Sequence, residues 1–427
     1  MTFDFLTKPI SAKELKKDLT PGLAEYEKSE PKMVAIDADY VPDAKITEAA
    51  NAVVNNIGVL NYGNNVIRAH PSCMDMAVAV YHASKKAGSN PIMFLWPFEE
   101  ALDALLKNAT DESMKCATKA YVGTIKVANH WSVTYGRTGY ELSAEAKKNY
   151  HYYGQMMKAA GETLNPKLEN GELVSWNMIH QPLPNHAANV KMDFEKYETK
   201  ILDAMCIKTE PVLQKETEQA LASFAKQIDD HTLVGRDGLF QLEIGNTSLK
   251  FGVEGRQVFR DVGRAGVDVD MKTKKPKATT NNPFGEFFVA PVETSVNGSV
   301  GTQIPSETPM GTLSHTYFKF EDGYAIKLAT SDNDIFKKVF SGINERAIAE
   351  LGFGGQNPGL KFLEEIGLPT GDALIDEKVF PLHIAIGAND HMGGDRSAKI
   401  HHDFSIGESG SVGSRPLTVK KVAEEYC

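Results

Sequence analysis

The chain has 427 residues, of which 42% are hydrophobic and 24% are charged, a composition typical of a globular protein in water. Its formal net charge is −10 and it contains no long run of lysine and arginine, so we expect no nucleic-acid partner. No apolar run approaches the roughly 18 residues of a membrane span, and the N-terminal segment lacks the pattern of a signal peptide. We therefore expect neither a membrane partner nor a secretory route.

The four cysteines are scattered along the chain and form no CxxC pair. Such a pattern favours free thiols in a reducing compartment, so we expect a cytoplasmic protein. The length exceeds what one hydrophobic core usually serves, which indicates more than one domain. Because the residue pattern changes near position 230, we place an N-terminal domain at 1–229 and a C-terminal domain at 230–427.

The N-terminal part alternates between helix-like and strand-like segments. Residues 46–72 predict a helix, a turn and a strand, and residues 73–88 predict a helix that a glycine ends. Residues 91–96 form a short apolar run that is typical of a buried strand. This alternation predicts an α/β domain with a parallel sheet covered by helices. Since no GxGxxG motif accompanies it, we predict no dinucleotide site.

The middle of the chain is mainly helical in pattern, for example in 99–110 and 216–228. Between these helical runs, residues 176–190 predict a loop rich in proline and asparagine. This loop contains His180 and His186. We expect both histidines on the protein surface, and the alternative is that they contact substrate.

From about position 231 the pattern becomes rich in β-strands. Residues 239–255 and 313–331 each predict a hairpin, and the second hairpin turns at 321–323. Between them, the basic segment 271–282 predicts an exposed loop, with a phosphate-binding or nucleic-acid patch as the less favoured interpretation. The C-terminal domain is therefore predicted to be of α+β type.

Histidines concentrate near the C-terminus, where four of the chain's twelve lie within twenty residues and are mixed with aspartates. Histidine and carboxylate at such close spacing are the ligands that borderline divalent metals prefer. The alternative is a solvated polar loop without a metal. The residues concerned are His383, His391, His401 and His402 together with Asp390, Asp395 and Asp403.

The segment 400–406 has the composition of a strand. On a strand, His401 and Asp403 point to the same face and His402 points to the opposite face. The pattern therefore offers one histidine and one carboxylate side by side.

Two glutamates could extend such a site. Glu286 follows a turn at Gly285 and begins a predicted strand, and Glu350 ends a predicted helical segment before a glycine-rich break. A metal hydrolase needs further ligands of this kind, and a carboxylate that can take a proton from metal-bound water.

Four segments follow one another in the second half of the chain: NNPFGEFFVAP (281–291), IAELGFGGQNPG (348–359), DEKVFPLHIAIG (376–387) and GGDRSAKIHHDFSI (393–406). In this order they resemble the signature blocks of the aminopeptidase T/aminopeptidase S family of thermophilic metallopeptidases. A weaker match within 45–95 extends the resemblance to the N-terminal region. The resemblance implies an α/β domain followed by an α+β metal-binding domain, with the site near the cleft, and a homodimer.

The resemblance also implies an activity, namely a metal-dependent hydrolase of aminopeptidase type that acts on a peptide or small amide with a free amino group. One or two divalent transition-metal ions (Zn, Co or Mn) would activate water and hold the substrate. Glu350 is implied as the carrier of the water proton, and Asp403 as a bridge between two ions. The implied ligands are Glu286, Glu350, His383, His401 and Asp403.

The chain departs from the family pattern in three places. The family's metal-binding tyrosine is absent, and Asp390 or His391 is offered instead. His402 replaces the tryptophan of a His-Trp-Asp triplet, and Arg396 replaces an asparagine. An arginine beside cations would be repelled unless an anion lay between them, so we expect Arg396 to bind a substrate carboxylate. The alternative is a surface arginine paired with Asp395 or another acid.

A second class of enzyme stays open. The ring-cleaving dihydroxypyridine dioxygenases resemble the same metallopeptidase fold but use one Fe(II) ion, held by two histidines and a carboxylate. His383, His401 and Asp403 would supply that triad. A third class, a non-catalytic binding protein, is disfavoured because all five implied ligand types are present.

Overall fold

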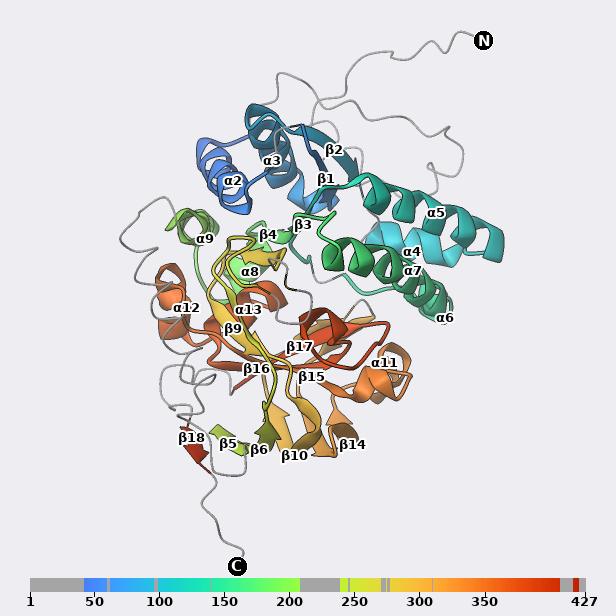
Figure 1. The fold of residues 1–427 in the computed structure, drawn as a ribbon, viewed down its shortest axis with the longest axis vertical. Helices are drawn as coiled ribbons and strands as arrows, with labels where there is room; N and C mark the ends of the chain where they lie inside the picture. The colour runs from blue at the N-terminus through green and yellow to red at the C-terminus, as the bar shows by residue number, and fades with distance from the viewer. Residues whose placement is uncertain are drawn as a thin grey trace, which may run out of the picture.

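The structure is a computed structural model that describes most of the chain (Figure 1). The described residues are 42–59, 62–95, 99–138, 140–207, 239–244, 246–269, 274, 277–308, 310–407 and 418–421. The helix predicted at 216–228, the domain boundary predicted at 229/230 and Cys427 lie outside them. Within these ranges, no helix is both long enough and apolar enough to cross a membrane.

The N-terminal part is built around a five-stranded parallel sheet with the strand order β2-β1-β3-β4-β8. This confirms the α/β region with a parallel sheet that the alternating pattern predicted. The strands are β1 (Asn64–Ala69), β2 (Asn90–Leu95), β3 (His130–Tyr135), β4 (Ser175–His180) and β8 (Thr279–Asn282).

Helices cover both faces of this sheet, because successive residues of a strand point to opposite sides. In β1, Ile67 packs with α2, α3 and α9, whereas Val66 packs with α5 and α7 (Figure 1). The helices of this part are α2 (Ala44–Ile57), α3 (Met74–Lys86), α4 (Glu100–Lys107), α5 (Asp111–Val127), α6 (Ala144–Lys148), α7 (Tyr150–Glu169), α8 (Pro184–Asn189) and α9 (Phe194–Cys206).

The C-terminal part is rich in antiparallel sheet. A six-stranded sheet has the order β14-β13-β10-β6-β5-β18, a five-stranded sheet has the order β17-β16-β15-β9-β7, and β11 pairs with β12. The strands of the larger sheet are β5 (Leu239–Ile244), β6 (Thr247–Gly252), β10 (Val292–Thr302), β13 (Thr316–Glu321), β14 (Tyr324–Thr330) and β18 (Thr418–Lys421). Both predicted hairpins are confirmed as β5–β6 and β13–β14.

The smaller sheet contains the residues of the candidate site. Its strands are β7 (Val258–Asp261), β9 (Glu286–Val289), β15 (Ile348–Phe353), β16 (Leu382–Gly387) and β17 (His401–Ile406), and the paired ribbon is β11 (Ser306–Thr308) with β12 (Gly311–Leu313). The helices of this part are α11 (Asn333–Val339), α12 (Lys361–Ile366) and α13 (Ala373–Val379). The two large sheets share one hydrophobic core, in which the rings of Phe318 and Phe404 lie 5.0 Å apart between their centroids.

The prediction of a loop at 176–190 is wrong. These residues form β4 and α8, and Pro184 opens α8 at a position where its missing N–H costs nothing. As a result His180 and His186 are fully buried rather than on the surface.

Two further predictions need correction. The predicted helical segment that ends at Glu350 is wrong, because Glu350 lies inside β15 and only a single 3-10 turn, Asn344–Arg346, directly precedes that strand. β15 is buried on both faces, so its apolar residues do not alternate and mimic a helical spacing. β2 is present as predicted, but it is the edge strand of its sheet, and Ile92 is 40% exposed.

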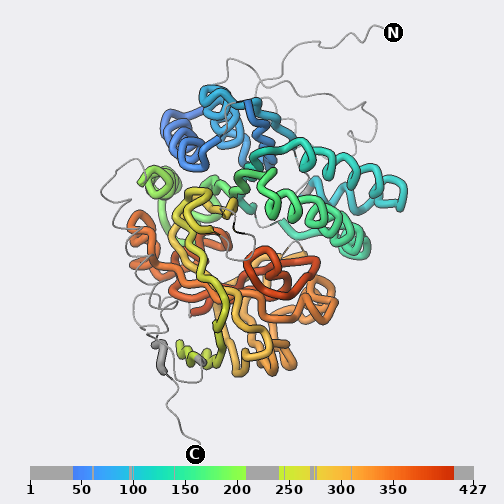
Figure 2. Tube along the Cα trace, in the orientation of Figure 1, coloured from blue at the N-terminus to red at the C-terminus, as the bar shows by residue number. Residues whose placement is uncertain are grey.

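The chain passes from the first sheet to the site-bearing sheet within three residues. β8 ends at Asn282, residues 283–285 turn, and β9 begins at Glu286. Figure 2 shows this yellow part of the trace reaching the green segment that it pairs with. Glu286 is therefore placed where the two parts of the molecule meet.

Candidate metal centre

The five predicted ligands lie on neighbouring strands of the smaller sheet. The strand register fixes their positions, because Ala385 of β16 is paired on one side with Glu350 and on the other side with Asp403. The small alanine leaves the space between the two carboxylates open. The five residues are distributed as Glu286 on β9, Glu350 on β15, His383 on β16, and His401 and Asp403 on β17.

The side chains of these five residues converge. Nε2 of His383 lies 3.2 Å from Oε1 of Glu350 and 3.5 Å from Oε2 of Glu286. Nε2 of His401 lies 3.1 Å from Oε2 of Glu350 and 3.6 Å from Oδ1 of Asp403. Each oxygen of Glu350 therefore faces one imidazole, and this carboxylate is the centre of the cluster.

The donor set fits a divalent metal. Two ligand atoms about 2.1 Å from one ion, at a tetrahedral angle, lie about 3.4 Å apart, which is close to the separations seen here. The ligand atoms of Glu350, His383 and Asp403 all lie within 4.8 Å of one another, as do those of Glu286, Glu377 and His383. In addition, Oε2 of Glu286 is buried without a hydrogen-bond partner among the described residues.

In a metal-ligating histidine, the N–H of the second ring nitrogen normally donates a hydrogen bond to an acceptor. Nδ1 of His401 lies 2.7 Å from the carbonyl oxygen of Ala388, as that expectation requires. Nδ1 of His383 is buried and has no hydrogen-bond partner among the described residues. Of the two histidines, only His401 has such an acceptor among the described residues.

Charge pairing dominates the ionisation of the cluster. Burial disfavours the Glu350 carboxylate, but hydrogen bonds to His383 and His401 hold its pKa far below the usual range. Burial likewise lowers the pKa of His383, and the contacts with Glu350 and Glu286 outweigh it and raise that pKa to about 9. In the metal-free protein, protonated histidine therefore balances the charge of the carboxylates, a role that a bound cation would otherwise have.

Lys378 is part of the site although the sequence analysis did not single it out. Its buried ammonium lies 2.5 Å from Oε1 of Glu286 and 3.5 Å from Oδ2 of Asp261, and it also contacts Glu377. Burial alone would lower the pKa of Lys378, and the surrounding carboxylates raise it above the ordinary value. The sequence signal that could have indicated Lys378 was the charged triplet at 376–378, three residues before the buried strand β16.

A cavity of about 380 Å³ opens in front of the cluster, within the range of small-ligand sites. Its wall includes Glu286, Glu350, His401 and Asp403 on one side. Three residues that the sequence analysis did not predict also line it, and they line a second, adjoining hollow as well: Tyr135, Arg137 and Glu307. Burial raises the pKa of Glu307 to about 7, so the cavity has a carboxyl group that titrates near neutral pH.

The remaining predicted residues differ in their position relative to this cavity. His391 lines it, and its ring centroid is 5.2 Å from that of His401. Asp390 is not among the lining residues, and its Oδ1 lies 3.7 Å from Nδ1 of His391. The guanidinium of Arg396 lies 4.7 Å from the ring centroid of Tyr324 and is likewise not among the lining residues.

Solved structures of two other proteins are similar to this chain. AmpT from Thermus thermophilus is similar in structure, with 16% identity, a TM-score of 0.63, and coverage of 89% of this chain and 99% of AmpT. A 2,5-dihydroxypyridine dioxygenase from Pseudomonas putida KT2440 has 13% identity and a TM-score of 0.46. The match covers 85% of this chain and 92% of the dioxygenase. No curated protein matches the chain.

The family comparison covers most of the chain. The profile of the thermophilic metalloprotease (M29) family matches residues 43–407, a range that includes all five candidate ligands. The fold is that of AmpT, with an α/β region before a sheet-rich region. The chain belongs to the thermophilic metalloprotease (M29) family.

Proposed function

We propose that the protein is a metal-dependent hydrolase of aminopeptidase type that cleaves a peptide or small amide with a free amino group. The observation that carries the proposal is the position of Glu350, whose two oxygens face two histidines at the wall of a cavity. Membership of a metalloprotease family supports the hydrolytic chemistry.

Glu286, Glu350, His383, His401 and Asp403 would hold one or two divalent ions of the Zn, Co or Mn type. Such an ion supplies Lewis acidity, which polarises a carbonyl group and lowers the pKa of water. His391 lies close enough to the cluster to take the place of the tyrosine that the family uses.

The protein's own groups would bind the substrate and transfer a proton from the attacking water. Glu350, which lines the cavity, would accept a proton from the attacking water and pass it to the leaving amine. A free amino group is cationic at neutral pH, and it would be attracted by the carboxylate of Asp403 and, where it is ionised, by that of Glu307. The substrate amine would be oriented by this field.

The five-residue set also bears on the dioxygenase alternative. A mononuclear two-histidine, one-carboxylate iron site needs only three protein ligands. Here Glu286 and Glu350 both lie within 3.5 Å of His383, so two further carboxylates contact the triad. This arrangement favours the hydrolase, and we offer no second function.

The test uses the full-length protein, stripped with chelator and reloaded under anaerobic conditions with Zn²⁺, Co²⁺ or Mn²⁺. We expect hydrolysis of aminoacyl amides and no hydrolysis of their N-acetyl counterparts. Glu350→Gln should abolish turnover, whereas the surface change Glu321→Gln should not alter it. Cleavage of the blocked substrates would overturn the aminopeptidase assignment, and turnover of a hydroxylated aromatic only with Fe²⁺ and oxygen would overturn hydrolysis itself.

A further inference from the structure

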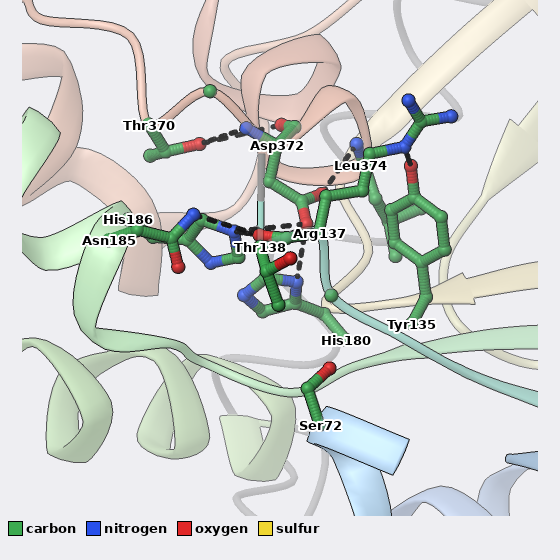
Figure 3. Close-up of polar contacts among 12 residues, drawn as sticks. Ser72, Tyr135, Arg137, Thr138, His180, Asn185, His186, Thr370, Asp372 and Leu374 are labelled. Atoms are coloured by element: carbon green, nitrogen blue, oxygen red, sulfur yellow. Dashed lines mark hydrogen bonds and ion pairs between the residues drawn. The ribbon is translucent and has the colours of Figure 1, made fainter. Parts of the chain in front are cut away.

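A second cluster of metal-ligating residues lies apart from the catalytic candidates. It consists of His180 at the end of β4, His186 on α8 and Asp372 directly before α13. All three side chains are fully buried. Figure 3 shows them pointing toward one another from three different elements, so the cluster joins the N-terminal part of the chain to the C-terminal part.

The separations within this cluster suit a shared ion. Nδ1 of His180 lies 3.3 Å and Nε2 of His186 lies 3.7 Å from the same oxygen, Oδ2 of Asp372. These values lie close to the roughly 3.4 Å expected between two ligands of one tetrahedral Zn²⁺. The three ligand atoms all lie within 4.8 Å of one another. The carbonyl oxygen of Arg137 accepts a hydrogen bond from Nε2 of His186 at 2.9 Å, so it lies where it could become a fourth ligand atom once an ion replaces the proton on that nitrogen.

Apart from the contact between His186 and Arg137, most polar atoms of the cluster are not satisfied by protein contacts. Among the described residues, Oδ2 of Asp372, both ring nitrogens of His180 and Nδ1 of His186 are buried without a hydrogen-bond partner. The other oxygen of Asp372 accepts a hydrogen bond from the backbone N–H of Leu374 at 3.0 Å, so the carboxylate is held with Oδ2 toward the histidines. Buried polar atoms are nearly always paired, so several unpaired ones together call for a bound ion or ordered water.

The protonation states of His186 and Asp372 are compatible with metal binding. Burial lowers the pKa of His186 to about 4, so this imidazole is neutral and can act as a ligand near pH 7. Burial opposes ionisation of Asp372, and the neighbouring His180 and His186 outweigh it and hold its pKa at about 2. A carboxylate and a neutral imidazole are the forms in which these residues bind a metal.

We propose that His180, His186 and Asp372 form a second metal site that binds a divalent ion of the Zn²⁺ class in a structural role. None of the three lines the catalytic cavity, and the site is closed to solvent, as structural zinc sites are. Arg137, whose carbonyl oxygen would complete the coordination, and Leu374, which follows the site on α13, both line that cavity. The ion would therefore fix two segments of the cavity wall against each other.

The first experiment measures metal content in variants of the full-length protein. Asp372→Asn keeps the side-chain volume and the helix cap but removes the charge. We expect it to bind about one ion fewer per chain than the wild type by plasma mass spectrometry. In a His383→Ala/Asp403→Ala background, which disables the catalytic cluster, one ion should remain and should be lost when Asp372→Asn is added.

The matched control is Asp332→Asn, which changes the equivalent cap of α11 at a residue that belongs to neither cluster. It should leave the metal content unchanged. Equal metal content in Asp372→Asn and the wild type would overturn the proposal. Because these readouts do not depend on turnover, they can succeed even if the proposed peptidase activity is absent.

A second measurement needs no variant and covers the case in which Asp372→Asn fails to fold. Crystals of the unaltered protein, grown with stoichiometric Zn²⁺, should give an anomalous peak at the zinc edge between His180, His186 and Asp372. Ordered water without anomalous signal at that place would overturn the proposal.

Discussion

The ring of His383 packs directly on the backbone of Gly352, so a Cβ atom added at Gly352 would lie 1.9 Å from Nε2 of His383. The two residues are paired across β15 and β16, which leaves the ring no room to withdraw along the sheet. The absence of a side chain at position 352 is therefore a condition for the position of a candidate metal ligand.

The first prediction follows from this contact. Gly352→Ala should displace the imidazole, lower kcat and metal affinity strongly, and reduce the free energy of unfolding by about 1–3 kcal/mol. Gly123→Ala is the matched control, because a Cβ at that helical position meets nothing within 4 Å. It should stabilise the protein by up to about 1 kcal/mol and leave activity unchanged. Normal activity of Gly352→Ala would show that His383 is not a ligand.

The second prediction concerns pH in the metal-free protein. The folded-state pKa of His383, about 9, lies above its ordinary value of 6.5. Its bound proton therefore stabilises the metal-free fold fully below pH 6.5, and this contribution is lost as the pH rises through about 9. Because a metal needs the neutral ring, Zn²⁺ affinity should rise over the same interval.

Calorimetry can measure both parts of this prediction. The Tm of chelator-treated protein should fall between pH 6.5 and 9, and His383→Asn should weaken that dependence. Titration of Zn²⁺ in two buffers of different ionisation enthalpy should reveal proton release near pH 7. An affinity that does not change with pH would contradict the assignment.

The third prediction concerns Lys378, which neutralises buried carboxylates including Glu286 and Asp261. Lys378→Met would leave these charges uncompensated, and we expect a loss of about 3–5 kcal/mol in the free energy of unfolding. The control is Lys158→Met, which removes an exposed pairing with Glu162 that is worth at most about 1 kcal/mol. Denaturant titration of both variants measures the difference, and similar losses would refute the charge-neutralising role.

The fourth prediction separates two arginines. Arg137 lines the cavity, whereas the guanidinium of Arg396, the residue predicted to clamp a substrate carboxylate, lies over Tyr324. If the carboxylate is bound at the cavity wall, Arg137→Lys should raise KM for carboxylate-bearing substrates by about tenfold or more, because lysine lacks the planar fork. Arg396→Lys should then have no effect. The reverse result would favour Arg396, and unchanged kinetics in both variants would retire the clamp altogether.

Local sequence signals indicated part of the candidate site, and the family resemblance implied the full set of ligands. Two-residue periodicity placed His401 and Asp403 on one face of a strand and His402 on the other. Nε2 of His402 lies 2.8 Å from the hydroxyl oxygen of Ser306, and His402 also lines the cavity. A turn glycine, with φ of +130°, placed Glu286 at the start of β9. Metal ligation by these residues, the homodimer and the cytoplasmic location stay predictions.

Contacts between distant segments could not be predicted in the same way. His180 and His186 lie among prolines and asparagines, which locally favour a loop, but they lie buried on β4 and α8, where they contact Asp372 from far along the chain. Arg137 likewise has no motif around it, and only the folded structure places it at the cavity. Tertiary packing overrode local propensity at each of these positions.

The pairing of β8 with β4 has a consequence for dissection of the protein. A fragment that ends before β5 would lack β8, and the backbone donors and acceptors along Trp176–Ile179 would lie uncovered at a sheet edge. Such an edge invites pairing with other chains, so the fragment should aggregate when it is made alone. Co-expression with the complementary fragment would return the missing strand, which makes this protein suited to reconstitution from two pieces.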